Sequence, residues 1–257
     1  MKTHKLWLEK LRSTTKIGLL LMMGASMSAC ASTSWKEQVL LHDGSKIIVE
    51  RSVDRGGRHE IGQQPPIKEQ SLAFTLPTTN ERITWKSEFS KDVGLADFQP
   101  LLLDIFHGAA YIVTSTVGCL SYNKWGRPNP PYVIFKSQDK AWQRITMQEL
   151  PAKLNKPNLI FSSPDNEVEK LGKRFISVAM VQQANSDLTQ TQFKTILREA
   201  YPGAGGGCIK TDYYGKAGWL SPDWFTDQPS LEACKKICDH KKIGAEICPC
   251  STIFKGK

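Results

Sequence analysis

Several signatures of nucleic-acid binding and of common catalytic machinery are missing from this sequence. It has no block of five or six like charges, no basic stripe and no nucleic-acid-binding module. Gly-x-Ser-x-Gly, the turn that exposes a serine nucleophile, does not occur, and the glycine-rich segment 201–208 lacks the Gly-Lys-Ser/Thr ending that holds a triphosphate. We therefore expect no nucleic-acid partner. An enzyme is disfavoured without being excluded, because scattered polar residues can still meet in a folded site.

The composition is that of a folded globular protein. Of the 257 residues, 40% are hydrophobic and 23% are charged, and no low-complexity tract interrupts them. The formal net charge is +9, but residues 1–29 contain five basic side chains and one acidic one, which leaves 29 basic and 24 acidic residues in the rest of the chain. This mild excess is typical of a soluble protein and does not predict a polyanion site. The length allows one large domain or two small ones.

The first thirty residues have the three parts of an export signal. A basic opening runs to Lys16, an apolar stretch covers 17–25, and the small residues Ser26, Ser28 and Ala29 follow. The apolar stretch is too short for a permanent membrane helix, which needs about 20 residues. We therefore expect residues 1–29 to be a signal peptide that is removed after export.

The end of this signal resembles the lipobox of bacterial lipoproteins. In Met27-Ser28-Ala29-Cys30, Ser28 and Ala29 are the small residues that let the signal peptidase reach the bond before the cysteine, whereas Met27 stands where leucine is usual. The resemblance implies diacylglycerol on the Cys30 thiol and an acyl chain on its amine, which together anchor firmly. Ala31 is not the aspartate that holds family members in the inner membrane. The resemblance therefore implies an outer-membrane protein that faces the periplasm.

Beyond a short lipidated tether, residues 30–37, the pattern changes to paired strands. Asp43-Gly44 lies between two strand-like runs and is the strongest short hairpin signal, because both residues accept positive φ. The expected strand pairs are 38–41 with 46–50, 72–76 with 82–88, 101–106 with 111–117, and 132–136 with 142–146. The predicted fold class is α+β, mainly antiparallel β, with a sandwich or a meander over residues 38–181. A propeller is less favoured because no residue signature repeats.

Residues 182–257 are predicted to form a helical, cysteine-rich C-terminal region. Just before it, 159–162 and 175–181 are predicted strands. An Asp-x-x-Gln capping box followed by apolar residues at helical spacing predicts a helix over 187–200. A second helix, with a serine cap, is predicted over 231–242.

Six cysteines remain once Cys30 carries lipid, and an even number in an exported chain predicts disulfides, because the periplasm is oxidising. They are Cys119, Cys208, Cys234, Cys238, Cys248 and Cys250. The cysteines of Cys248-Pro249-Cys250 are too close to pair comfortably with each other, so we expect two bridges from them to the 231–242 helix. By elimination, the third bridge joins Cys119 to Cys208.

A zinc site is the alternative for the last four of these cysteines. Zinc ribbons place each pair of thiolates two to four residues apart, which Cys234 and Cys238 satisfy and the Cys-Pro-Cys pair does not. Neither a Cys-x-x-Cys redox motif nor a haem-attachment motif occurs. We therefore predict no metal site and no cofactor.

Two loops are candidates for a binding surface. Arg55 and Arg58 lie in a flexible, basic loop and could hold a carboxylate or phosphate through paired hydrogen bonds. Trp125, Arg127 and Tyr132 belong to a loop rich in aromatic residues and proline, of the kind found at recognition surfaces. The alternatives are a solvated turn for the arginines and core packing for the aromatic residues.

Together these features predict an outer-membrane-anchored periplasmic lipoprotein that acts as a binding or envelope-assembly module. Its partners would be the membrane, through the lipid, and envelope proteins or cell-wall polymer. The first alternative is a cell-envelope hydrolase with a site assembled from loops that carry His59, Asp104 or His107. The second is a metal- or redox-handling protein that uses the C-terminal cysteines.

Overall fold

The computed structural model describes residues 32–139 and 141–255. The predicted signal peptide, the predicted lipobox and Cys30 lie outside the described residues. Within these ranges, no helix combines the length and the apolar character that a membrane crossing requires. Residues from Ser32 onward form one compact unit.

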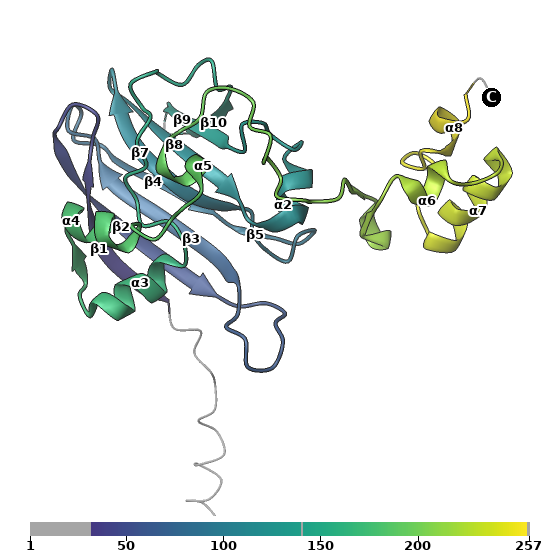
Figure 1. Ribbon diagram of the computed structural model, residues 1–257, viewed down its shortest axis with the longest axis horizontal. Helices are drawn as coiled ribbons and strands as arrows, with labels where there is room; N and C mark the ends of the chain where they lie inside the picture. The colour runs from purple at the N-terminus through teal and green to yellow at the C-terminus, as the bar shows by residue number, and fades with distance from the viewer. Residues whose placement is uncertain (1–31, 140, 256–257) are drawn as a thin grey trace, which may run out of the picture. The chain divides into compact units, whose positions relative to one another are not determined.

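Two antiparallel sheets form the centre of the fold (Figure 1). The first has the order β11-β1-β2-β3-β4, with β1 Thr33–Leu40, β2 Lys46–Arg55, β3 Ile67–Thr75, β4 Arg82–Ser87 and the short β11 Phe175–Ile176, which is parallel to β1. The second has the order β10-β9-β8-β7, with β7 Phe98–Phe106, β8 Ala109–Thr116, β9 Val133–Gln138 and β10 Ala141–Ile145. Two-stranded ladders join β5 Phe89–Ser90 to β6 Leu95–Ala96 and β12 Asp212–Tyr213 to β13 Trp219–Leu220. The predicted α+β class, mainly antiparallel β, is confirmed.

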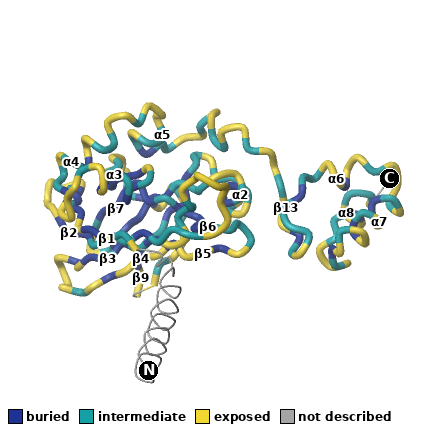
Figure 2. Tube along the Cα trace, turned by 90° about the horizontal axis from the view of Figure 1, so that it is seen from below, coloured by how far each residue is buried: buried dark blue, intermediate teal, exposed yellow. Residues whose placement is uncertain are grey.

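The two sheets share one apolar core, so the fold is a sandwich. Alternate residues of each strand face this core, as the period of two requires. Val49 and Phe74 from the first sheet pack with Leu103 and Ile112 from the second, and all four are fully buried. Figure 2 shows this buried interior between the strands. The other face of the first sheet is exposed to solvent. It carries Lys36, Glu50 and Arg82, which form ion pairs at the surface.

Each sheet has a further cover. The helices α3 (Pro164–Leu171) and α4 (Val178–Ala184) pack over the N-terminal part of β1 and the end of β2. Coil residues and the single turn α5 (Thr191–Lys194) cover the second sheet on the side away from the core. The central parts of β7 and β8 are therefore buried on both faces, whereas the edge strand β10 is largely exposed.

A buried ion pair lies on the inner face of the first sheet, between the part covered by the second sheet and the part covered by the helices. The Glu37 and Arg51 side chains are 0% and 1% exposed, with 2.8 Å between Oε2 and NH1. Glu37 also accepts hydrogen bonds from the Trp35 indole and from the Ile160 N–H, and Arg51 donates to the Ile160 carbonyl. The pair therefore ties the coil before α3 to β1 and β2.

Three predicted elements differ from the structure. The stretch 159–162 is coil, because its N–H and C=O groups bond to side chains of the pair above and of Asn185. The stretch 175–181 contains two residues of strand and then α4, which starts where the Ser177 side chain accepts a hydrogen bond from Met180 N–H. The helix predicted over 187–200 is reduced to α5, although its apolar residues still pack against the second sheet.

The C-terminal part contains α6 (Asp223–Thr226), α7 (Leu231–Lys241) and α8 (Cys250–Ile253), preceded by the 3-10 turn Gly215–Ala217. The helix predicted over 231–242 is confirmed, and the Ser230 hydroxyl caps it by accepting from Ala233 N–H at 3.1 Å. Between β8 and β9, α2 (Gly118–Lys124) was not predicted.

Three disulfides confirm the prediction for the six cysteines that follow Cys30. Cys119 on α2 bonds to Cys208, and the C-terminal cysteines pair as Cys234–Cys250 and Cys238–Cys248. The last two bridges are neighbours, with 3.7 Å between the sulfurs of Cys238 and Cys250. They form the centre of a small core with Phe225 and Ile243.

Candidate functional site

A cavity of about 770 Å³ opens beside the turn between β1 and β2. Its walls come from that turn, the end of β7, the coil before α3, and the helices α4 and α5. They are lined by Leu40, Leu41, His42, Gly44, Asp104, Lys153, Asn155, Lys156, Pro157, Asn158, Val178, Val181, Gln182, Asn185, Phe193 and Lys194. Its volume lies in the range of small-molecule sites in proteins.

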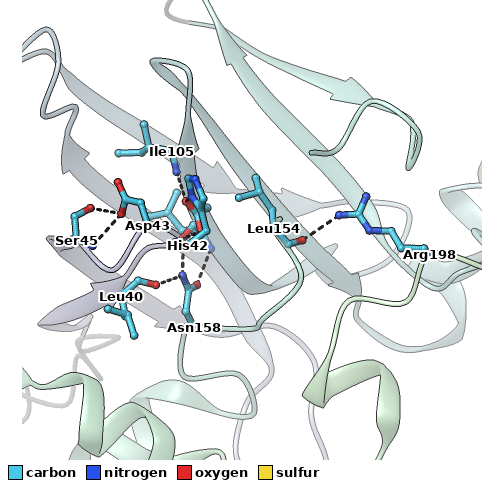
Figure 3. Close-up of polar contacts among 10 residues, drawn as sticks. Leu40, His42, Asp43, Ser45, Ile105, Leu154, Asn158 and Arg198 are labelled. Atoms are coloured by element: carbon cyan, nitrogen blue, oxygen red, sulfur yellow. Dashed lines mark hydrogen bonds and ion pairs between the residues drawn. The ribbon is translucent and has the colours of Figure 1, made fainter. Parts of the chain in front are cut away.

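The turn beside the cavity is shaped by Asp43 and Gly44. Gly44 has φ +85°, whereas Asp43 keeps a negative φ and its carboxylate accepts hydrogen bonds from the N–H and hydroxyl of Ser45 (Figure 3). The predicted hairpin is present, but its connection is longer than a two-residue turn, so Gly44 alone of the two residues adopts a positive φ. This geometry leaves the His42 N–H free to bond outside the hairpin.

His42 and Asp104 form a dyad at the cavity wall. The His42 Nδ1 lies 2.7 Å from the Asp104 Oδ1, and the His42 N–H donates to Oδ2 at 2.9 Å. The Ile105 N–H donates to Oδ1 at 2.8 Å. Because an ionised carboxylate only accepts, Nδ1 carries the proton, and Nε2 makes no hydrogen bond with a described residue. This arrangement fixes the imidazole and leaves one of its nitrogens for a ligand.

The environment of Asp104 penalises its charge. The side chain is 4% exposed, and burial raises the pKa of this carboxyl above its ordinary value of 3.8, while the hydrogen bonds from His42 and Ile105 oppose the shift. The His42 side chain is 16% exposed and packs against the Phe106 ring. A buried carboxylate that orients a histidine is a common arrangement at functional sites, and it is also a way to fasten a turn to a sheet.

Asp104→Asn tests how the dyad is held. The amide nitrogen cannot accept from the His42 N–H, so we expect the free energy of unfolding to fall by about 1–3 kcal/mol near neutral pH. The pKa of the Asp104 carboxyl is higher in the folded state than in the unfolded chain, where it is 3.8. Protonation of this carboxyl therefore stabilises the folded state below pH 3.8, and this stabilisation is lost as the pH rises through the folded-state pKa. The advantage of the wild type over the variant should therefore be largest in acid and shrink as the pH rises, measured by urea unfolding. A constant difference across that range would contradict a raised pKa.

Two side chains hold the other walls in place. Asn158 donates to the carbonyls of Leu40 and Leu103 and accepts from the Leu103 N–H, at 2.8–2.9 Å (Figure 3). Arg198 donates to the carbonyls of Leu150 and Leu154, among others, and burial lowers the pKa of its guanidinium. These bonds fix both ends of the coil 153–158, so the cavity has a preformed wall.

The hydrolase candidates are only partly brought together. Asp104 lines the cavity, but its partner is His42 and not His59 or His107. His107 stacks on Phe106, which separates it from the dyad, and His59 bonds to the Gly57 carbonyl in an exposed loop. No local pattern marks this pairing, because His42 and Asp104 are 62 residues apart in the chain.

The predicted binding loops make contacts inside the protein. Arg55 donates two hydrogen bonds to Asp165, at 2.5 and 2.7 Å, and one to a backbone carbonyl, whereas Arg58 lies exposed in the loop with no ion pair among the described residues. Trp125 donates to Asp97 and packs on Phe98. A binding role for these loops stays a prediction.

Arg127 and Tyr132 are likewise held by neighbours. Arg127 donates to Asn123 and to the Cys208 carbonyl, next to the disulfide. The Tyr132 hydroxyl donates to backbone carbonyls at the end of α5, and burial raises the pKa of Tyr132 to about 12. A second cavity of about 340 Å³ lies beside them, near Asn129 and Arg144.

Among the described residues, one group could offer three metal ligands, the sulfurs of Cys238, Cys248 and Cys250, which lie within 4.8 Å of one another. All three are in disulfides, and a sulfur in a disulfide is not the thiolate that zinc binds. Among the described residues that line the cavity, His42 and Asp104 are the only ones of the types His, Cys, Asp and Glu that ligate metals.

Searches of protein families, of curated proteins and of solved structures find no match to the chain.

Proposed function

We propose that this protein is an exported lipoprotein of the outer membrane whose sandwich domain binds a ligand in the cavity beside His42 and Asp104. The observation that carries the binding function is the cavity itself, which is large enough for an organic molecule and has walls fixed by Asn158 and Arg198. The lipobox resemblance supports the anchor. The partners are then the membrane, through the lipid, and an envelope component or cell-wall polymer that presents the ligand.

Cys30→Ala tests the anchor. Because the thiol is the acceptor of the diacylglycerol, the variant should lose metabolic palmitate labelling completely. Met27→Leu, which places the usual residue in the lipobox, is the matched control and should retain the label. Unchanged labelling of the Cys30 variant would exclude lipidation at this site.

A second candidate function is hydrolysis, and the His42–Asp104 dyad favours it. With Asp104 holding Nδ1–H, Nε2 could accept a proton from water as the water oxygen attacks a substrate in the cavity, and then return it to the leaving group. Among the described residues no hydroxyl or thiol bonds to the imidazole, so the nucleophile would be water. Turnover of cell-wall fragments, followed by mass spectrometry, should fall at least about 100-fold in His42→Gln if this function is correct. Turnover unchanged in that variant would exclude the dyad as the base.

A further inference from the structure

The charges in the cavity wall indicate what kind of ligand it takes, if it is the binding site proposed above. Lys153, Lys156 and Lys194 contribute to the lining, and none of them forms an ion pair with a described residue. Asp104 is the one carboxylate in the lining, and its oxygens already accept three hydrogen bonds. Three ammonium groups face one carboxylate, so the cavity wall has a net positive charge.

The hydrogen-bonding groups lead to the same conclusion. The amides of Asn158 and Asn185 are occupied, since each donates to a backbone carbonyl and accepts from a backbone N–H. The groups left for a ligand are the three ammonium groups, which only donate, the side-chain amides of Asn155 and Gln182, and the His42 Nε2, which accepts. A ligand that satisfies the ammonium groups must be rich in acceptors and negatively charged.

The size and the apolar part of the lining exclude a bare inorganic ion as the full occupant. Leu41 and Val181 are buried at the wall, and Val178 and Phe193 are partly exposed there. A phosphate ion would leave most of about 770 Å³ unfilled and these side chains uncovered. We propose that the cavity binds an organic anion, a carboxylate or phosphate group joined to an acyl or aryl body, with the lysines holding the charge and the apolar wall covering the body.

The test is a calorimetric titration of the soluble chain from Ser32, which forms a compact unit of its own. The probes are decanoate, decyl phosphate, inorganic phosphate and decyl maltoside, all below their micelle concentrations. We expect saturable one-site binding of decanoate or decyl phosphate. Inorganic phosphate and decyl maltoside should bind at least about 10-fold more weakly, because the first lacks the body and the second lacks the charge. Equal binding of either one would overturn the proposal.

Removing the lysine charges from the cavity wall tests whether the anion binds there. The triple variant Lys153→Gln, Lys156→Gln, Lys194→Gln should weaken binding of the decyl probe about 10–100-fold at low salt. The matched control, Lys216→Gln, Lys235→Gln, Lys236→Gln, removes the same charge from the C-terminal part and should stay within about twofold of the wild type. Equal weakening by both triples would assign the effect to net charge and contradict the site. Urea unfolding of both variants verifies that they are folded.

A titration with muropeptides, which are anionic cell-wall fragments without a fatty acyl chain, distinguishes a wrong ligand class from the absence of a binding function. If they bind at this cavity and the decyl anions do not, the ligand class is wrong and the binding function stands. Val181→Trp, which narrows the cavity, should then weaken their binding. If no probe binds, both are contradicted.

Discussion

Glu37→Gln is expected to lower the free energy of unfolding by about 3–5 kcal/mol, because it leaves the buried Arg51 charge without its partner. All of the groups that surround the Glu37 carboxylate are donors, from Trp35, Arg51 and Ile160. The amide nitrogen of glutamine cannot accept from any of them, so one donor also loses its bond. Equilibrium urea unfolding measures the loss.

Glu50→Gln is the matched control. Glu50 precedes Arg51 in β2, but its side chain lies on the solvent-exposed face of the same sheet. Its side chain is 46% exposed and pairs with Arg82 and Lys36 in solvent, so its removal should cost far less than the removal of Glu37. Adding Arg51→Met to Glu37→Gln removes the orphaned charge, and the double variant should be less destabilised than the sum of the two single changes. Additive losses, or equal losses at Glu37 and Glu50, would contradict a coupled buried pair.

Removal of the Cys119–Cys208 disulfide, by Cys119→Ser with Cys208→Ser, is expected to cost about 4–5 kcal/mol. The bridge closes a loop with a sequence separation of 89, and in the chain-entropy model the stabilisation increases with the loop length. The same segment is also held by Asn123, which donates to the Ile209 carbonyl and the Thr211 hydroxyl, and by Arg127, which donates to the Cys208 carbonyl. These bonds should keep the region folded in the variant.

The control for this variant is removal of the Cys238–Cys248 bridge, which has a sequence separation of 10. Its loop-entropy contribution is smaller, about 2.5–3 kcal/mol. With Trp219 and Trp224 replaced by phenylalanine, so that the signal no longer comes from the C-terminal part, chemical denaturation followed through tryptophan fluorescence should change for the first variant and not for the second. A response of the sandwich to the C-terminal bridge alone would contradict this assignment.

The sequence was most informative where local signals decide the structure. Asp43-Gly44 predicted the β1–β2 hairpin, and the strand predicted over 82–88 is present as β4, in which Ile83 and Trp85 are buried and Thr84 between them is exposed. The Ser230 cap predicted the start of α7. In each of these cases the partner of a residue lies within a few positions or across one turn.

Long-range contacts account for what the sequence did not show. The apolar residues after Asp187 have helical spacing, yet the helix ends at Thr195. The Tyr132 hydroxyl donates to the carbonyls of Gln192 and Thr195, and the Ile196 N–H donates to the Asn155 carbonyl. A tertiary partner replaced the helical hydrogen bond.

The candidate site was hidden for the same reason. Asp104 alone was selected from the sequence, since nothing local marks His42 as its partner or Lys194 as a neighbour of Lys153. Only the packing of the turn, the coil 153–158 and the helices α4 and α5 brings these residues to one cavity.

The most direct test of the binding site is to record amide chemical shifts of the isotope-labelled chain from Ser32 while decanoate is added. Ligand in the proposed cavity should shift the signals of His42, Asn155 and Val181, and those of Asn129 and Ala200 at the second cavity should stay unchanged. Shifts confined to the second cavity, or spread evenly over the chain, would contradict the account.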